Sequence, residues 1–454
     1  MTKTESNGAA SHEDPSPPAS PGRRLSKTVV ALGFVSLFTD VASEMVYTQV
    51  PIFLTQVMGV RADVIGIIEG VAESTASLLR VVAGGLSDLS GRRKPLTIAG
   101  YGFGAIAKPL LALATGWPMV LALRFLDRVG KGLRTAPRDA LIADETPPEL
   151  RGRAFGLHRA MDTTGAVLGP LLGLWFLSQF VASNEVKLRS LFLFAGIPGV
   201  LAVLTLIVFV RERTGDLSRA KAQMRKEEIG DSAHTKARRH EDEGAKGYPE
   251  ETARTRTESK SLLAQWQALE PAYRRFLLIT LLFNLGNSSD AFLILRANHL
   301  GFDSQMLLWL YAAFNVVEAA LGYAAGILSD KVGRKPLIIA GYAIFALVYL
   351  GFALVNGRNH LAIWGLFLLY GGYYTLTQGS QRAFAADFAD PARRGAQIGA
   401  YHTVVGLSLL PASILAGQLY LWRQPAPFFL SAGTAAASAV LLLGLPVRRT
   451  EEMR

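Results

Sequence analysis

The chain has 454 residues, of which 50% are hydrophobic and 18% are charged, and its mean hydropathy is +0.27. Soluble domains average about 25% charged residues, so this composition favours an integral membrane protein. The net charge of +11 would also suit nucleic-acid binding, but the long apolar runs make cytoplasmic loop charge beside anionic lipid the simpler explanation. The absence of cysteine excludes a disulfide framework, a thiolate metal site and a cysteine nucleophile.

The apolar runs divide the chain into two sets of six. Residues 1–25 contain no apolar core, so we expect a disordered cytoplasmic tail rather than a signal peptide. The first half spans 26–211, and its runs are each near or above the roughly 20 residues that a spanning helix needs. These runs cover residues 28–50, where Pro51 breaks the helix, and 62–84, 96–114, 118–143, 154–181 and 188–210.

A charged segment separates the two sets. Residues 212–265 are dense in Arg, Lys, Glu and Asp and hold no run that could span a bilayer, so we expect a partly disordered cytoplasmic linker. The second half spans 266–446, and a short cytoplasmic tail occupies 447–454. Its runs cover residues 272–298, 305–327, 336–356, 360–386, 395–420 and 425–445.

Twelve spanning helices place both termini on one side of the membrane. The loops on that side carry most of the cations, whereas the opposite loops carry few, such as Arg61, Lys187 and Arg358. Because cytoplasmic loops are enriched in Lys and Arg, the positive-inside rule predicts cytoplasmic termini. We expect a multi-pass protein of the cell membrane, which in a bacterium is the inner membrane.

One loop occurs twice, once in each half. Residues 84–96 and 326–337 share the same order of Gly, Asp, Gly and cations, and residues 144–156 match residues 387–399. Repeats of this length predict two related six-helix halves. Gly84 and Gly326 fall in the predicted last turn of a spanning helix, where a missing side chain allows close helix approach.

The pattern Gly-x-Leu-x-Asp-x-x-Gly-Arg-Arg/Lys in these loops resembles the loop signature of the major facilitator superfamily. The resemblance implies an all-α integral membrane fold of twelve transmembrane helices, built as two six-helix repeats that rock about a midplane site. In that family the Asp and Arg pair with neighbouring helix ends and latch one of two alternating conformations. The alternative is a basic loop that only sets topology. The implied latch residues are Gly84, Asp88, Gly91, Arg92, Arg93, Gly326, Asp330, Gly333 and Arg334.

Ionisable residues inside spanning helices cost about 2.5–3.5 kcal/mol each, so they are functional candidates. The run 118–143 carries a charged stripe at intervals of three to four residues, which must face the bundle interior because lipid cannot solvate it. The run 154–181 adds His158, Arg159 and Asp162. The residues predicted for the central cavity and for proton coupling are Asp40, Glu44, Glu69, Glu73, Arg124, Asp127, Arg128 and Lys131; Arg134 and Arg138 extend the stripe.

Burial favours a protonated carboxyl group and a nearby cation favours an ionised one, so an acid that faces the stripe could exchange protons near neutral pH. The segment Arg128-x-x-x-Gly132 resembles the superfamily's signature for the fourth helix, with Lys131 where Gln is more usual. The resemblance implies a role for Arg128 in proton coupling. The alternative is a set of buried ion pairs that only hold the helices together, which would be a weak means of stabilisation.

The run 154–181 carries a second signature, Gly-x8-Gly-x3-Gly-Pro-x2-Gly. Glycines at these spacings predict a smooth groove for tight helix packing, and the proline removes one backbone hydrogen bond and bends the helix. The pattern resembles the antiporter motif of drug:proton exporters in the superfamily, and generic small-residue packing is the alternative. Its members are Gly156, Gly165, Gly169, Pro170 and Gly173.

The second half is poorer in charge, which suggests that it fits the substrate while the first half carries the coupling chemistry. A copy of the glycine signature is degraded around Gly406 and Pro411. Tyrosines in the run 360–386 fit either of two roles, packing against neighbouring helices or binding the substrate. The substrate-side candidates are Asp290, Asn315, Glu318, Tyr374, Arg382 and His402.

The sequence lacks a phosphate loop, a His-Glu-x-x-His metal site and a Gly-x-Ser-x-Gly elbow, so we expect no enzyme, metal or cofactor. We predict a secondary active transporter that exports small molecules in exchange for protons by alternating access, functional as a monomer in the bilayer. One alternative is uptake or exchange of an organic anion, metabolite or metal chelate. Another is a membrane sensor that transports nothing.

Overall fold

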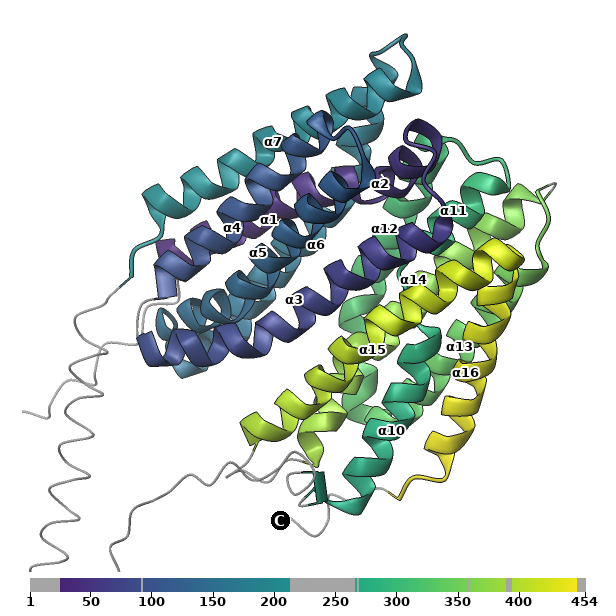
Figure 1. Cartoon of the computed structure of the whole chain (residues 1–454). Helices are drawn as coiled ribbons and strands as arrows, with labels where there is room; N and C mark the ends of the chain where they lie inside the picture. Colours follow the sequence, from purple (N-terminus) through teal and green to yellow (C-terminus); the bar gives the residue numbers. More distant parts are fainter. Residues whose placement is uncertain are drawn as a thin grey trace, which may run out of the picture.

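The computed structural model describes residues 25–90, 93–212, 266–267, 269–357, 359–388 and 394–446, and all regular structure in these ranges is helical (Figure 1). The predicted tails and the predicted linker lie outside the described residues, apart from residues 25 and 212.

The first half contains six long helical segments. They are α1 (Lys27–Tyr47), continued by α2 (Gln49–Ile52) and the π-helical η1 (Phe53–Val57); α3 (Ala62–Ser90); α4 (Arg93–Leu110) with the 3-10 turn η2 (Leu111–Leu113); α5 (Trp117–Asp144); α6 (Arg151–Ser178), preceded by η3 (Pro148–Leu150); and α7 (Asn184–Phe209).

The second half repeats this organisation. It contains α10 (Pro271–Gly286) with α11 (Ala291–His299), α12 (Ser304–Val332), α13 (Arg334–Leu354), α14 (His360–Asp387), α15 (Arg394–Trp422) and α16 (Ala426–Leu443). In the described part of the chain, nine spans are long and apolar enough to cross a membrane. The predicted all-α membrane fold of two six-helix repeats is confirmed.

Two predicted runs differ from the observed helices. The prediction that Pro51 breaks the first helix was wrong, because the chain leaves the helix for one residue at Thr48 and is helical again through Val57. Proline has no N–H to bond to the carbonyl four residues earlier, so the interruption falls one turn before the proline. The run 272–298 was expected to be continuous, but residues 287–290 are not helical.

The predicted position of the repeat glycines was also wrong. Gly84 and Gly326 do not lie in the last turn, since α3 continues to Ser90 and α12 to Val332. A Cβ at Gly84 would lie 3.6 Å from Ala136 on α5, an ordinary contact, and a Cβ at Gly326 would meet nothing within 4 Å. Close helix approach at these two glycines is therefore not observed.

The two halves use the same internal packing. In the first half α1 packs on α6 and α7, and α4 packs on α5 and α7; in the second half α10 packs on α15 and α16, and α13 packs on α14 and α16. Exposed apolar side chains cover the outer faces of α7 and α16, including Leu204, Phe209 and Leu441, as expected for surfaces that face lipid.

The sequence repeat reappears as a repeat of contacts. Arg93 at the start of α4 binds Asp144 and donates to the carbonyl of Ala140 at 2.9 Å. Its counterpart Arg334 binds Asp387 and donates to the carbonyl of Ala383 at 2.7 Å.

A lysine follows each of these arginines, and the two lysines make equivalent contacts in the two halves. Lys94 Nζ donates to the carbonyl of Ile207 at the end of α7, and Lys335 Nζ donates to the carbonyls of Leu443 and Leu445 at the end of α16. Cations at a helix C-terminus satisfy carbonyls that have no partner within the helix. Each repeat loop thus ties neighbouring helix ends within its own half.

The halves meet along two helix pairs, α3 with α15 and α6 with α12, which lie between the purple-to-teal half and the green-to-yellow half in Figure 1. The α3–α15 contact depends on small residues. A Cβ at Gly66 would collide with the carbonyl of Ser413, and a Cβ at Gly417 would lie 2.7 Å from the carbonyl of Ala62. Backbone lies directly against backbone along this seam.

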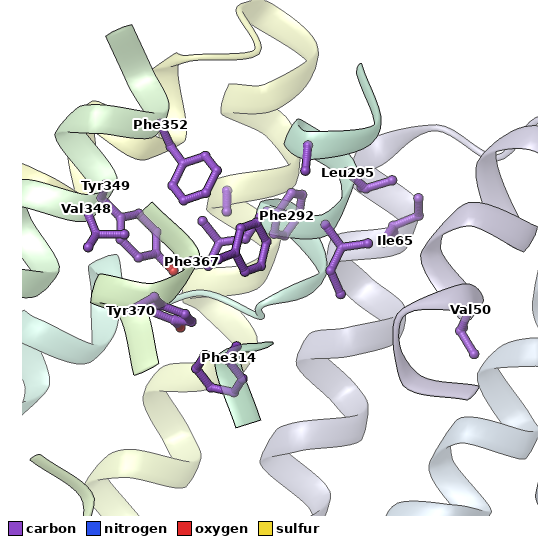
Figure 2. Close-up of a cluster of buried hydrophobic side chains, with 14 of the residues drawn as sticks. Val50, Ile65, Phe292, Leu295, Phe314, Val348, Tyr349, Phe352, Phe367 and Tyr370 are labelled. Carbon is purple, nitrogen blue, oxygen red and sulfur yellow. The ribbon is translucent and has the colours of Figure 1, made fainter. Parts of the chain in front are cut away.

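One end of the bundle is closed by contacts between the halves. There Gln49 Nε2 donates to the carbonyl of Ser304 at 3.1 Å, and Gln56 Nε2 donates to Asn298 Oδ1 at 3.1 Å. Buried apolar residues of both halves belong to one cluster, and Figure 2 shows Ile65 of the first half beside Leu295 and Phe292 of the second.

We expect Gly66→Val to destabilise the protein, because the added carbons overlap the carbonyl of Ser413. Overpacking of this kind costs about 1–3 kcal/mol. Thermal unfolding of the purified protein in detergent measures the change. The control is Gly102→Val on α4, where an added Cβ meets nothing within 4 Å. Equal unfolding temperatures for the two variants would contradict a tight α3–α15 seam.

Candidate functional site

A cavity of about 500 Å³ lies between the two halves. Its walls are formed by α1, α3, α4, α5 and α6 of the first half and by the 287–290 break, α12, α14 and α15 of the second. Among the described residues its lining contains nine Lys or Arg and eight Asp or Glu. The predicted stripe on α5 faces this cavity, and every one of its charged members lines it.

The deepest ion pair of the stripe joins Arg124 to Glu69. The Arg124 guanidinium contacts both oxygens of Glu69, at 2.8 Å and 2.6 Å from Nη2 and at 3.1 Å from Nε. Glu69 is 1% exposed, so this pair is sealed from water. Ser289, in the break of the second half, lies 3.4 Å from the same carboxylate. Glu69 therefore belongs to a structural contact behind the cavity wall rather than to its lining.

The next turns of α5 bind α3 and α4. Arg128 Nη2 lies 3.3 Å from Glu73 Oε1, and Asp127 Oδ1 accepts a hydrogen bond from Lys108 Nζ at 2.8 Å. Lys108 on α4 is 4% exposed and donates also to the carbonyl of Gly104. Each charge here has an opposite charge within reach, as burial requires.

Farther along the stripe, toward the C-terminal end of α5, the cations make fewer ion pairs with described residues. Within the described part of the chain, Lys131 is exposed to the cavity and makes no ion pair. Arg134 Nη1 is buried without a hydrogen-bond partner, although its guanidinium lies 4.7 Å from the Tyr101 ring centroid. The stripe is neutralised near the closed end and carries surplus positive charge away from it.

The acids of α1 face charged side chains of α6. Asp40 and Asp162 both line the cavity and lie close enough for their carboxyl groups to act on one another, and Ser36 donates to Asp162 at 2.7 Å. Two neighbouring carboxyl groups repel one another when both are ionised, so this pair is a candidate proton site. Arg159 then bridges the halves, contacting Asp162 at 3.2 Å and Glu318 on α12 at 2.8 Å.

Glu44 lies one turn beyond Asp40 on α1 and also lines the cavity. Tyr311 on α12 acts on its carboxyl group from the opposite half, while Oε2 is buried and has no hydrogen-bond partner among the described residues. Lys131 and Arg128 are the nearest cations that act on this carboxyl group. Glu44 is thus a second acid in contact with both halves.

The glycines of α6 position these acids. A Cβ at Gly165 would lie 3.1 Å from the Cβ of Asp40, and a Cβ at Gly169 would lie 2.9 Å from the Cβ of Glu44. Gly173 contacts Leu308 of α12 and Met45 of α1 less closely, and Pro170 sits inside the helix. Gly156 was wrongly included in the groove, because an added Cβ there meets nothing within 4 Å.

The break in the second half places Asp290 at the cavity. Asp290 accepts hydrogen bonds from the hydroxyls of Tyr370 at 2.5 Å and Tyr374 at 3.0 Å, so its carboxylate is already bound. Tyr370 belongs to the aromatic core that Figure 2 shows around Phe314 and Tyr349. The tyrosines therefore both pack and hold a polar group.

The other substrate-side candidates divide into two groups. Asn315, Glu318 and Arg382 line the cavity, and Asn315 also donates to the carbonyl of Ala166 on α6 at 2.9 Å. His402 does not line it; its backbone carbonyl accepts a hydrogen bond from Ser77 on α3. His402 lies on the α3–α15 contact, so the structure does not bring it into the cavity lining with the other candidates.

The predicted latch is described only in part. Gly91 and Arg92 lie outside the described residues, as do the side chains of Asp88 and Asp330. Gly333 has φ +90° and links α12 to α13, a conformation that glycine adopts without strain.

Sequence reasoning missed Lys108 and Arg80, both of which line the cavity. Each is the single cation of its predicted run, and an ionisable residue inside a spanning helix is a functional candidate. Sequence reasoning also named Asp162 but not its proximity to Asp40, because pairing between helices far apart in sequence leaves no local pattern.

The fold and cavity agree with the comparisons to known proteins. A model described as Major Facilitator Superfamily matches residues 32–413, and again 276–454. The chain belongs to the major facilitator superfamily. It is a multi-pass membrane transporter and not an enzyme, and transporters of this family bind small-molecule substrates.

An uncharacterised MFS-type transporter of Methanocaldococcus jannaschii is 35% identical over 93% of this chain and 95% of its own length. A multidrug resistance protein, MdtH, of Photorhabdus laumondii is 33% identical over 33% of this chain and 37% of its own. The structure of the nucleoside transporter NupG has a TM-score of 0.68 at 12% identity, covering 92% of this chain and 99% of that one, which shows the shared fold.

We expect Glu69→Gln to destabilise the protein strongly, because it leaves the buried Arg124 without a counter-charge. Breaking one partner of a buried pair costs about 3–5 kcal/mol. The control is Glu185→Gln, which breaks the exposed pair with Arg189 on α7 and should cost about 0–1 kcal/mol. Chemical denaturation in detergent compares the two, and a Glu69→Gln loss no larger than the control would show that the pair is not structural.

Proposed function

We propose that this transporter exports small molecules in exchange for protons. The observation that carries the proposal is the neighbouring acids Asp40 and Asp162, which line the cavity and are joined to the opposite half through Arg159 and Glu318. A proton site coupled to a contact between the halves is what proton-driven alternating access requires.

The direction of transport rests on two weaker observations. Gly165 and Gly169 of the antiporter-type signature hold α6 directly against the acids of α1, so the signature is part of the proton site. The partial similarity to a multidrug resistance protein also favours export. Uptake or exchange remains the second candidate, and the unpartnered cations of the cavity favour an anionic cargo for it.

The orientation follows from the distribution of cations. We propose that the termini and the linker are cytoplasmic, in the inner membrane if the source is a bacterium. The end closed by Gln49 with Ser304 and by Gln56 with Asn298 then faces outward, and this conformation receives cargo from the cytoplasm. The protein works as a monomer in this proposal, because the two halves of a single chain together form the walls of the cavity.

Coupling proceeds through the link between halves. When the pair of Asp40 and Asp162 loses its proton, the second negative charge holds the Arg159 guanidinium toward α6 and weakens its contact with Glu318. Reprotonation releases Arg159 to bind Glu318 again. The α6–α12 contact is therefore set by the protonation state, which biases the halves between two arrangements.

The repeat loops are proposed to act as latches. Arg93 and Arg334 already bind acids at the ends of α5 and α14, so a change at the same loop would alter how these helix ends move. We expect Asp88→Asn and Asp330→Asn proteins to insert normally, and the Asp88 change to slow transport strongly. Transport assays in reconstituted vesicles test this, and unchanged rates for the double variant would exclude a latch.

We expect Asp40→Asn and Asp162→Asn each to abolish export driven by a pH gradient while exchange of cargo without a gradient continues. Neither amide can carry the exchanged proton, but the cavity remains. The measurement uses inverted vesicles and a cargo identified by a growth panel of toxic compounds and metals on cells with and without the protein.

The matched control is Asp63→Asn, which removes an acid paired with the exposed Arg61 at the start of α3 and should export normally. Normal pH-driven export by the Asp40→Asn/Asp162→Asn double variant would place the proton carrier elsewhere, with Glu44 the next acid to test.

A further inference from the structure

We propose that the cargo is an organic anion and that Arg80 of α3 and Arg382 of α14 bind its charged group between the two halves. This inference rests on the proposed transport function and adds the chemical class of the cargo and its binding site.

Surplus positive charge lies away from the closed end of the cavity. Near that end, Arg124 and Arg128 of α5 are neutralised by Glu69 and Glu73, and Asp127 is paired with Lys108 of α4. Beyond that point Lys131 has no ion-pair partner among the described residues, and Arg134 has a buried Nη1 without one. The part of the cavity that lies toward Arg80 and Arg382 therefore has cations available for a ligand.

The surroundings of Arg80 leave one of its donors unsatisfied. Arg80 lines the cavity, its Nε is buried, and no described residue accepts a hydrogen bond from that Nε. The charges that act on it most strongly are those of the cations Arg382 and Arg138, and the acids Asp139 and Glu73 act on it more weakly. A buried donor without an acceptor, beside two like charges, is unfavourable unless an anion satisfies it.

The acids in this region are already bound. Asp139 accepts two hydrogen bonds from Arg138, at 2.8 Å and 3.0 Å, and Glu73 is paired with Arg128. No described acid thus contacts Arg80 or Arg382, and an external carboxylate, sulfonate or phosphate group would supply the missing charge. Guanidinium groups suit such ligands because their planar donors bind two oxygens at once.

Aromatic side chains line the part of the cavity that would hold the body of the cargo. Tyr47, Tyr311, Phe314 and Tyr374 line the same cavity nearer its closed end. Tyr374 and Arg382 lie eight residues apart on α14, which corresponds to about 12 Å along a helix. A cavity of about 500 Å³ with aromatic side chains at one end and arginines at the other fits an apolar or aromatic molecule with an anionic group at one end.

The position between halves gives the site a role in transport. Arg80 belongs to the first half and Arg382 to the second, so an anion bound by both joins the halves on the side of the cavity away from Gln49 and Ser304. Neutralising the repulsion between the two arginines removes a force that keeps the halves apart there. Cargo binding would thereby favour closure around the cargo.

The experiment measures binding to the purified full-length protein in detergent by titration calorimetry, with no pH gradient. The probe is 2-naphthalenesulfonate, and its counterpart is 2-naphthylmethylamine, which has a similar ring and the opposite charge. We expect saturable binding of the sulfonate and none of the amine. Arg80→Gln and Arg382→Gln should each weaken sulfonate binding by about tenfold or more, and the double variant should lose it.

Two further variants separate binding from folding. Arg382→Lys keeps the charge and should retain part of the affinity, and Arg423→Gln removes a cation at the end of α15, outside the cavity, and should bind normally. The proposal is overturned if the wild type does not bind the sulfonate, if it binds the amine equally well, or if the folded double variant binds as the wild type does. Because no gradient is involved, these results are independent of the test of Asp40 and Asp162.

Discussion

The structure depends on how the charged face of α5 is kept away from lipid. Six ionisable residues recur along this face, and burying any one of them alone would cost several kcal/mol. Arg124 and Arg128 are neutralised by Glu69 and Glu73 of α3, and Asp127 by Lys108 of α4. These pairs fix α3, α4 and α5 relative to one another. They also require a cavity that water can enter beside the cations that have no partner, so one constraint produces both the rigid first half and the site.

The contacts between the halves have a different physical character. Along α3–α15, glycines bring backbone against backbone, with Gly66 on Ser413 and Gly417 on Ala62. Shape complementarity of this kind is lost gradually as helices separate, and no buried charge is stranded when it opens. The ion pairs inside the first half would be costly to break, whereas the seam between the halves would not. The molecule is therefore built to move as two bodies, with the Arg159–Glu318 contact as the charged link between them.

Much of the fold could be predicted because its signals are local. Helix lengths follow from apolar runs, and the repeat of Arg93 and Arg334 in sequence became a repeat of ion pairs in space. The charged face of α5 could be predicted from its period alone. The break at residues 287–290 was missed, although its Asn, Ser and Asp residues follow Gly286 and form a turn-like cluster. Its stabilisation by Tyr370 and Tyr374, which bind Asp290 from α14, leaves no local pattern. The pairing of Asp40 with Asp162 likewise needed the packing of α6 on α1, which brings Gly165 against Asp40.

The two halves share a fold but differ in the side chains that fill their interiors. In the second half, aromatic rings fill the space that ion pairs occupy in the first, as in the stack of Phe283 on Tyr342 with centroids 3.9 Å apart. An aromatic core carries no charge that would have to be rehydrated when the cavity opens, so this half can present a stable wall in both arrangements. In the proposed mechanism, the chemistry that depends on protonation lies on the wall formed by α1, α5 and α6. Where that wall meets α12, at Arg159 and Glu318, we propose that a proton gained or lost in the first half is transmitted to the second as a change in one contact.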